Sequence, residues 1–194
     1  MSVIIGNQKY AIIGNQEWVR KNLNTDRYAN GDLIPEVTDP TAWGNLTTGA
    51  WCYYNNDPAN GSIYGKIYNW YAVTDPKGLA PVGYHIPTDA EWTILTDLLG
   101  GETIAGGKMK ERGTEHWNSP NISATNSSKF TGFAGGLRYV DGAFYDIGSY
   151  GSWWSYTEYG TLFAWGRSLY SNYGYVSRGV SNKTVGFSVR LIKD

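Results

Sequence analysis

Hydrophobic positions recur at helical spacing in two parts of this chain. The clearer pattern starts at Thr88, which can cap a helix, and Glu91 completes a capping box three residues later. Gly100 and Gly101 follow the pattern, and glycine commonly ends a helix. The predicted apolar face of this helix consists of Trp92, Leu95, Leu98 and Leu99.

A second helix is predicted over 64–73, where Ile67, Trp70 and Tyr71 share one face before the Asp75-Pro76 pair. A weaker helical turn is predicted over 105–110. Elsewhere, short β-prone runs alternate with glycine and asparagine turns. The runs predicted to be strands are 130–133, 136–139, 143–145, 152–155, 162–169, 173–177 and 185–192.

The N-terminal part carries two copies of Ile-Ile-Gly-Asn-Gln, at 4–8 and 12–16, which predict two short strands joined by a turn. A loop-rich stretch follows over 22–60. Helices and strands are segregated along the chain rather than alternating. This order predicts an α+β fold.

Composition and charge narrow the class of protein. With 194 residues, of which 41% are hydrophobic, the chain is expected to form one domain over 1–194. The net charge is −1 and the 16 Lys and Arg residues are scattered, so no nucleic-acid partner is expected. No apolar run is long enough to span a bilayer, so no membrane insertion is expected. Cys52 is the single cysteine, which excludes an internal disulfide.

The segment 156–185 differs in composition from the rest. Its 30 positions include 5 Tyr, 4 Ser, 2 Asn and 4 Gly. Antibody recognition loops use the same residue types, because Tyr supplies rigid contact area while Ser, Gly and Asn supply adaptable hydrogen bonds. We therefore interpret the segment as a binding surface.

Several motifs resemble those of one family. They are Gly-Tyr-His-Ile-Pro-Thr-Asp-Ala-Glu-Trp at 83–92, Trp-Trp-Ser at 153–155 and Gly-Phe-Ser-Val-Arg at 186–190, and 14–18 and 64–73 fit as well. Over 12–194 the chain resembles the Fibrobacter major paralogous domain family. The resemblance implies a C-type-lectin-like fold of the kind found in formylglycine-generating enzymes, with an antiparallel sheet, two helices, long loops and neighbouring termini.

The family resemblance also implies a use for the segment. Members of this family are known as variable proteins of diversity-generating retroelements, in which adenine-directed mutagenesis rewrites codons of the C-terminal segment. The scaffold residues would be Ala164, Trp165, Arg167, Leu169, Val176, Arg178, Gly186 and Phe187. They alternate with the other positions over much of the segment, which on a strand would send one set to the core and the other to solvent.

The remaining positions form the expected ligand-binding set. An aromatic-rich β-domain without diversification would show a similar surface, so that alternative stays open. The expected contact residues are Tyr156, Gly160, Thr161, Leu162, Phe163, Gly166, Ser168, Tyr170, Ser171, Asn172, Tyr173, Tyr175, Ser177, Gly179, Val180, Ser181 and Thr184.

Candidate catalytic groups have simpler structural interpretations. His85 and His116 are far apart in the sequence and lack the spacing of a metal frame. Asp89 and Glu91 lie two positions apart on a helix and would face different directions, so they are not expected to act as a glycosidase pair. Cys52 lies in an aromatic run, where a small buried thiol is common. No catalytic residue is expected, and the tryptophans, Trp165 included, are expected in the core.

No cofactor is expected either. The calcium-dependent sugar motifs of this fold, Glu-Pro-Asn, Gln-Pro-Asn and Trp-Asn-Asp, do not occur. A structural Ca²⁺ stays open as an alternative, because its oxygen ligands can come from distant segments.

The expected function is therefore non-enzymatic recognition of a protein or glycan receptor on a cell surface. The expected setting is a phage tail-fibre tip in the virion or a bacterial surface adhesin, with a homotrimer as one arrangement in a parent fibre. Two alternatives remain. One is a carbohydrate-active or formylglycine-generating-like enzyme with a cleft built from the loops over 22–60, and the other is a purely structural surface domain.

Overall fold

A small antiparallel sheet joins the two ends of the chain in this computed structural model, which describes residues 10–194. Its strand order is β1 (Tyr10–Ile13), β2 (Gln16–Val19), β12 (Ile192–Lys193) and β5 (Tyr84–His85). The second copy of the repeated motif forms the β1–β2 turn, where Gly14 has a φ of 59°. The first copy, at 4–8, lies outside the described residues.

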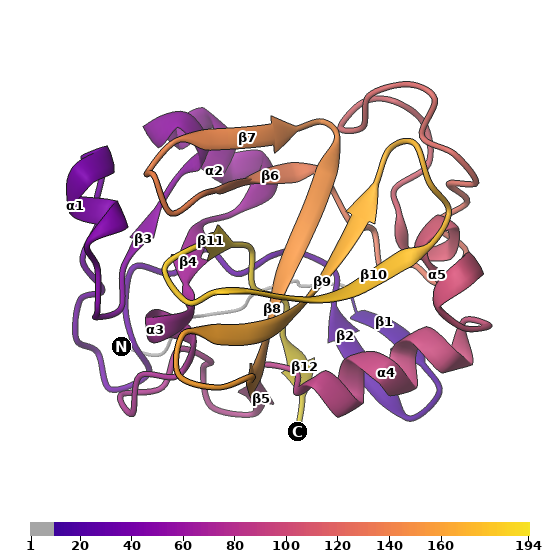
Figure 1. The fold of residues 1–194 in the computed structure, drawn as a ribbon. Helices are drawn as coiled ribbons and strands as arrows, with labels where there is room; N and C mark the ends of the chain where they lie inside the picture. The colour runs from indigo at the N-terminus through magenta and orange to yellow at the C-terminus, as the bar shows by residue number, and fades with distance from the viewer. Residues whose placement is uncertain (1–9) are drawn as a thin grey trace.

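The larger sheet has the order β10-β9-β8-β6-β11-β4-β3, and β7 pairs with β6. The long strands β8, β9 and β10 form an antiparallel meander at one edge (Figure 1). The strands of this sheet are β3 (Trp51–Cys52), β4 (Ile67–Asn69), β6 (Gly135–Arg138), β7 (Phe144–Ile147), β8 (Tyr150–Glu158), β9 (Phe163–Tyr170), β10 (Val176–Asn182) and β11 (Gly186–Phe187).

The best-marked helix is confirmed. α4 (Asp89–Leu98) begins with the predicted capping box between Thr88 and Glu91. Leu98 does not belong to its buried face, since the side chain is 54% exposed. α5 (Glu102–Met109) is longer than the predicted helical turn and packs under β10, where an added Cβ on Gly106 would lie 2.2 Å from the carbonyl oxygen of Tyr175. Only glycine allows this approach.

The single helix predicted over 64–73 is wrong. α2 (Pro58–Tyr64) ends before Gly65, whose φ is 78°, and the chain then enters β4. Asn69 caps the short α3 (Trp70–Val73) by accepting a hydrogen bond from the Ala72 amide. Apolar residues here are buried on every side, so their spacing does not distinguish helix from strand.

Other boundaries also differ from the predictions. Residues 130–133 form no strand, only an isolated bridge between Gly132 and Lys110. The strand predicted over 173–177 starts at Val176, and the one over 185–192 is split into β11 and β12. The loop-rich stretch over 22–60 contains β3 and α1 (Pro40–Gly44), a 3-10 turn (Tyr54–Asn56) and the start of α2. The α+β class is confirmed, with mostly antiparallel sheets and few helices.

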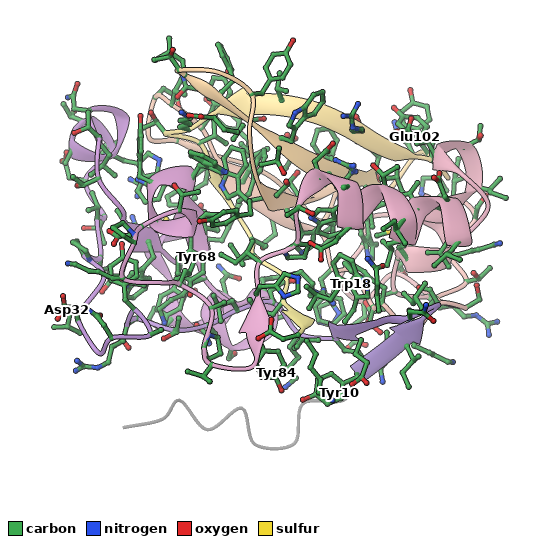
Figure 2. The ribbon with its side chains drawn as sticks, turned by 90° about the horizontal axis from the view of Figure 1, so that it is seen from below. Tyr10, Trp18, Asp32, Tyr68, Tyr84 and Glu102 are labelled. Carbon is green, nitrogen blue, oxygen red and sulfur yellow. The ribbon has the colours of Figure 1, made fainter. Side chains whose placement is uncertain are left out.

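The core lies on both faces of β8. Trp153 packs into a cluster beneath α4 and α5, whereas Trp154 packs into a second cluster with Phe187. Consecutive strand residues point to opposite faces, so the Trp-Trp pair fills two cores at once. Trp18 is fully buried beside Trp92, while the stacked Tyr10 and Tyr84 lie nearer the surface (Figure 2). In the described part of the chain, no helix is both long and apolar enough to cross a bilayer.

Candidate ligand-binding surface

The segment 156–185 forms the end of β8, all of β9 and β10, and the turns around them. Arg167 pairs with Arg178, and Gly166 pairs with Gly179. Directly opposed residues share a face of an antiparallel sheet. We call the face toward α4 and α5, which carries Arg167 and Arg178, the inner face, and the opposite face, which carries Ser168 and Ser177, the outer face.

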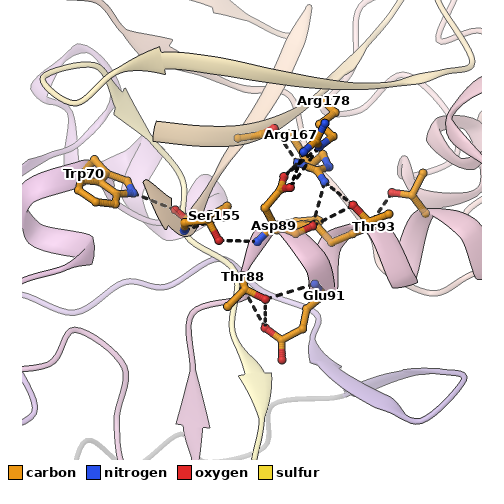
Figure 3. Close-up of polar contacts among 12 residues, drawn as sticks. Trp70, Thr88, Asp89, Glu91, Thr93, Ser155, Arg167 and Arg178 are labelled. Carbon is orange, nitrogen blue, oxygen red and sulfur yellow. Dashed lines mark hydrogen bonds and ion pairs between the residues drawn. The ribbon is translucent and has the colours of Figure 1, made fainter. Parts of the chain in front are cut away.

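One carboxylate fixes the middle of the inner face. Asp89 begins α4, and its Oδ1 accepts a hydrogen bond from Arg167 Nη1 at 2.6 Å (Figure 3). Arg178 donates from Nη2 to Asp89 Oδ2 at 2.8 Å and lies 3.8 Å from the centre of the Trp165 ring. Burial opposes ionisation of Asp89, but hydrogen bonds and charge from the two arginines hold its pKa below the usual range. Asp89 therefore binds both strands of the β9–β10 hairpin to α4.

A buried lysine holds the β9–β10 turn. Lys110 Nζ donates to the carbonyl oxygens of Ile122, Tyr170 and Tyr173, each at 2.8 Å. Burial lowers the pKa of Lys110 to about 8, so the amine is still mostly charged at pH 7. Its three hydrogens match the three acceptors. The turn that carries Tyr173 is thus fixed from inside the protein.

Another buried lysine holds the β8–β9 turn. Lys183 Nζ donates to Glu158 Oε1 and, at 2.8 Å, to the carbonyl oxygen of Thr161. The same ammonium lies 4.8 Å from the centre of the Trp70 ring. Both ends and the middle of the hairpin are therefore attached through cationic side chains that lie on its protein side.

Tyrosines gather at one end of the outer face. The Tyr170 ring centre lies 4.7 Å from that of Tyr150, 5.4 Å from Tyr175 and 6.1 Å from Tyr173. Tyr173 is 48% exposed and the other three are half-buried. We call these four residues the tyrosine cluster. Beyond it, the outer face continues through Ser177, Gly179 and Ser181 without a charged side chain, so it suits contact by aromatic rings and neutral hydrogen bonds.

A second exposed patch lies around the β8–β9 turn. Tyr159 packs against the edge of Trp165 with ring centres 4.9 Å apart. Leu162, Phe163 and Val180 lie in the same region, since Phe163 pairs with Asn182 and Val180 pairs with Trp165. Their exposed fractions, 57%, 41% and 39%, are high for large apolar side chains. This apolar patch is a second part of the candidate surface, at the opposite end of the hairpin from the tyrosine cluster.

The structure exposes or half-exposes most of the expected contact residues. The exposed ones are Tyr156, Gly160, Thr161, Leu162, Phe163, Asn172, Tyr173, Gly179 and Val180, and the half-buried ones are Ser168, Tyr170, Tyr175, Ser177 and Ser181. Their role in binding stays a prediction.

Three expected contact residues are buried instead, which is a correction. A Cβ on Gly166 would lie 3.0 Å from the Trp153 carbonyl oxygen and close to the Phe187 ring, so this position faces the core. Ser171 exchanges backbone hydrogen bonds with Ser149 and Ile122. Thr184 bonds to Asn182 Oδ1 through its amide and its hydroxyl.

The expected alternation of scaffold and free positions holds only in part. It is correct for Arg167 to Tyr170, where buried and half-buried residues alternate. It fails near the β8–β9 turn, because Phe163 and Val180 share the inner face with scaffold residues. Trp165 is half-buried, not in the core. The sheet extends past the start of α4 here, so the inner face is no longer covered.

The candidate catalytic groups are bound to structural partners. His85 lies 2.7 Å from Asp194 and 2.9 Å from Glu91, and these hydrogen bonds raise its pKa although burial opposes protonation. Glu91 at the same time completes the capping box. Burial raises the pKa of the Cys52 thiol to about 12, which disfavours the reactive thiolate.

One cluster of possible metal ligands was missed from the sequence. The ligand atoms of Glu111, Glu115 and His116 lie within 4.8 Å of one another. Glu111 Oε2 lies 2.8 Å from His116 Nδ1, so this pair is already hydrogen-bonded. Glu111, Glu115 and His116 lie close together in the sequence, and this proximity was the available signal for a group of possible ligands.

The fold and the surface together define an α+β domain with an aromatic, largely uncharged face on a C-terminal β-meander. The chain belongs to the family described as the Fibrobacter succinogenes major domain, whose sequence model matches residues 12–193. No curated protein and no solved structure matches the chain at a significant level.

Proposed function

We propose that this domain is a non-enzymatic receptor-binding module and that its contact surface is the exposed part of the outer face of β9 and β10, with the tyrosine cluster at one end of the hairpin and the apolar patch at the β8–β9 turn. One observation carries the proposal: Asp89, Lys110 and Lys183 attach the hairpin from its protein side. Gly166 lies on the outer face but packs against the core. The exposed and half-buried side chains of the outer face take no part in these attachments and can therefore change with little cost to the fold.

The composition of the surface indicates the kind of contact. The tyrosine cluster supplies rigid rings, and aromatic residues in the centre of an interface contribute most to affinity. The receptor is a protein or a glycan on a cell surface. Because the outer face lacks charge along Ser177, Gly179 and Ser181, recognition would rely on stacking and neutral hydrogen bonds.

The proposal includes a C-type-lectin-like fold and diversification of 156–185 by a retroelement. The first is supported by the pairing of β2 with β12 and by the two longer helices, α4 and α5. The second is supported by the tyrosine-rich exposed positions next to buried Arg167 and Leu169. A phage tail-fibre tip or a bacterial surface adhesin, trimeric in a parent fibre, would use such a module and gain avidity from several copies.

The test is a screen of the 194-residue chain on glycan and protein arrays, followed by the variant Tyr170→Ala/Tyr173→Ala/Tyr175→Ala. We expect the triple variant to lose at least about 30-fold in affinity for the receptor found, since central aromatic contacts are worth about 2 kcal/mol or more. Its free energy of unfolding should fall by no more than about 2 kcal/mol, because the rings pack mainly on one another.

The matched control is Tyr139→Ala, which removes a tyrosine that is 50% exposed in the β6–β7 region. This variant should bind like the wild type. Equal binding by the triple variant and the wild type would exclude the tyrosine cluster as the contact surface.

A further inference from the structure

A cavity of about 590 Å³ lies apart from the proposed receptor surface. Its walls come from the end of β2, from α2, from loops before β6 and from the chain before β12, and none of its residues belongs to 156–185. The side chains relevant here are Arg20, Lys21, Asn22, Ile63, Phe133 and Arg190. A volume of this size suits a small organic ligand.

The cavity has a buried positive charge on its inner wall. Arg190 is 1% exposed and makes no ion pair within residues 10–194. Nη1 donates to the carbonyl oxygens of Val19, Arg20 and Phe130, while Nε and Nη2 both donate to Asn22 Oδ1. Nη2 carries two hydrogens but has this one acceptor, so one hydrogen is left without a partner among residues 10–194.

Two further cations lie at the same cavity. Arg20 donates from Nε and Nη2 to the hydroxyl of Thr131, and its Nη1 has no acceptor in the described chain. Lys21 is exposed, and neither residue forms an ion pair with the described carboxylates. Burial lowers the pKa of Arg190 to about 9, with a smaller contribution from repulsion by the charge of Arg20. A bound anion would relieve this repulsion.

Another part of the cavity lining is apolar. The Phe133 ring stacks on His116 with ring centres 4.3 Å apart, and Ile63 of α2, which is 45% exposed, lies at the same cavity. Arg guanidinium groups bind planar carboxylates through paired hydrogen bonds. Apolar side chains that line the same cavity as such donors fit a ring or short chain attached to that carboxylate.

We propose that this cavity is a second binding site, separate from the receptor surface, that takes a small organic carboxylate. The carboxylate lies against Arg20 and the free Nη2 hydrogen of Arg190, with Lys21 at the entrance. The body of the ligand lies against Phe133 and Ile63.

The test measures binding of four probes to the full chain by calorimetry: benzoate, glucuronate, neutral methyl benzoate and inorganic phosphate. We expect benzoate, whose ring suits the apolar part of the lining, to bind saturably with a Kd of about 1 mM or tighter. Methyl benzoate should bind at least about 10-fold more weakly than benzoate. Arg20→Gln should weaken the carboxylate at least about 10-fold, because a charged hydrogen-bond partner is lost, while Arg27→Gln, an exposed arginine elsewhere, should not.

Arg20 is half-buried at the surface, so we expect the Arg20→Gln variant to fold, and melting curves of both variants would check this. Absence of saturable carboxylate binding would overturn the proposal. So would equal affinity for benzoate and methyl benzoate, unchanged carboxylate affinity in Arg20→Gln, or tighter binding of phosphate than of either carboxylate.

Discussion

Asp89→Ala should lower the free energy of unfolding by about 3 to 5 kcal/mol, because it leaves two arginine charges without their shared partner. Arg167 is 2% exposed, so its guanidinium cannot turn to solvent without opening the packing between β9 and α4. Arg178 would lose both acceptors and keep only its contact with Trp165. We expect the hairpin to separate from α4.

Denaturant unfolding of Asp89→Ala measures this loss. Asp97→Ala is the matched control, since Asp97 lies exposed on the same helix. It should change stability by less than about 0.5 kcal/mol. Equal losses in the two variants would contradict the assigned role of Asp89.

The charge of Asp89 also sets a pH dependence. Its pKa is lower in the folded protein than in the unfolded chain, so the stabilisation is complete above the unfolded pKa, which is about 3.9 for Asp. It is lost as pH falls through the folded pKa. Asp89→Asn should therefore remove part of the acid destabilisation that the wild type shows below about pH 4.

Lys110→Met should lower the free energy of unfolding by about 3 kcal/mol or more, because three carbonyl oxygens lose their donor at once. Methionine keeps most of the apolar stem, so the loss reports the ammonium and not the packing. The turn that carries Tyr173 would also become more mobile, and the receptor affinity should fall with it.

Denaturant unfolding and hydrogen exchange at the amides of 171–175 measure the two effects. Lys108→Met serves as the control, since Lys108 lies in the last turn of α5, two residues before Lys110, and its amine makes no hydrogen bond to the described residues. If the amides of 171–175 exchange no faster in Lys110→Met than in Lys108→Met, Lys110 does not hold the turn.

Local features were predictable from the sequence where neighbouring residues determine them. The capping box of α4 needs only Thr88 and Glu91, and the β-prone runs predicted strands that overlap β8 and β9. β10 runs over Val176–Asn182 and overlaps the strand predicted over 173–177 only at 176–177.

Arg167 and Arg178 were expected to belong to the scaffold, and the structure shows both bound to one carboxylate. Their shared partner Asp89 was not predicted. It lies 78 residues from Arg167 and 89 residues from Arg178 in the sequence, and only the fold brings the three side chains together.

The lysines that hold the turns were missed for a different reason. Lysine is rarely fully buried, so composition gives no reason to single out Lys110 or Lys183. Gly166 and Gly179 show in the same way that residue type alone does not predict burial on the candidate surface. They are directly paired and chemically identical, yet Gly166 lies against Trp153 while nothing lies within 4 Å of a Cβ on Gly179.

The central claim is that attachments on the protein side leave the exposed part of the outer face free to vary. Its most direct test measures the protease resistance of displayed variants that carry every single substitution at six positions, three on this part of the outer face and three at contacts between the hairpin and the rest of the domain. We predict that Ser177, Gly179 and Ser181 accept most side chains with losses below about 0.5 kcal/mol. Gly166, Arg167 and Lys110 should accept few. Equal intolerance at the two sets of positions would contradict the account.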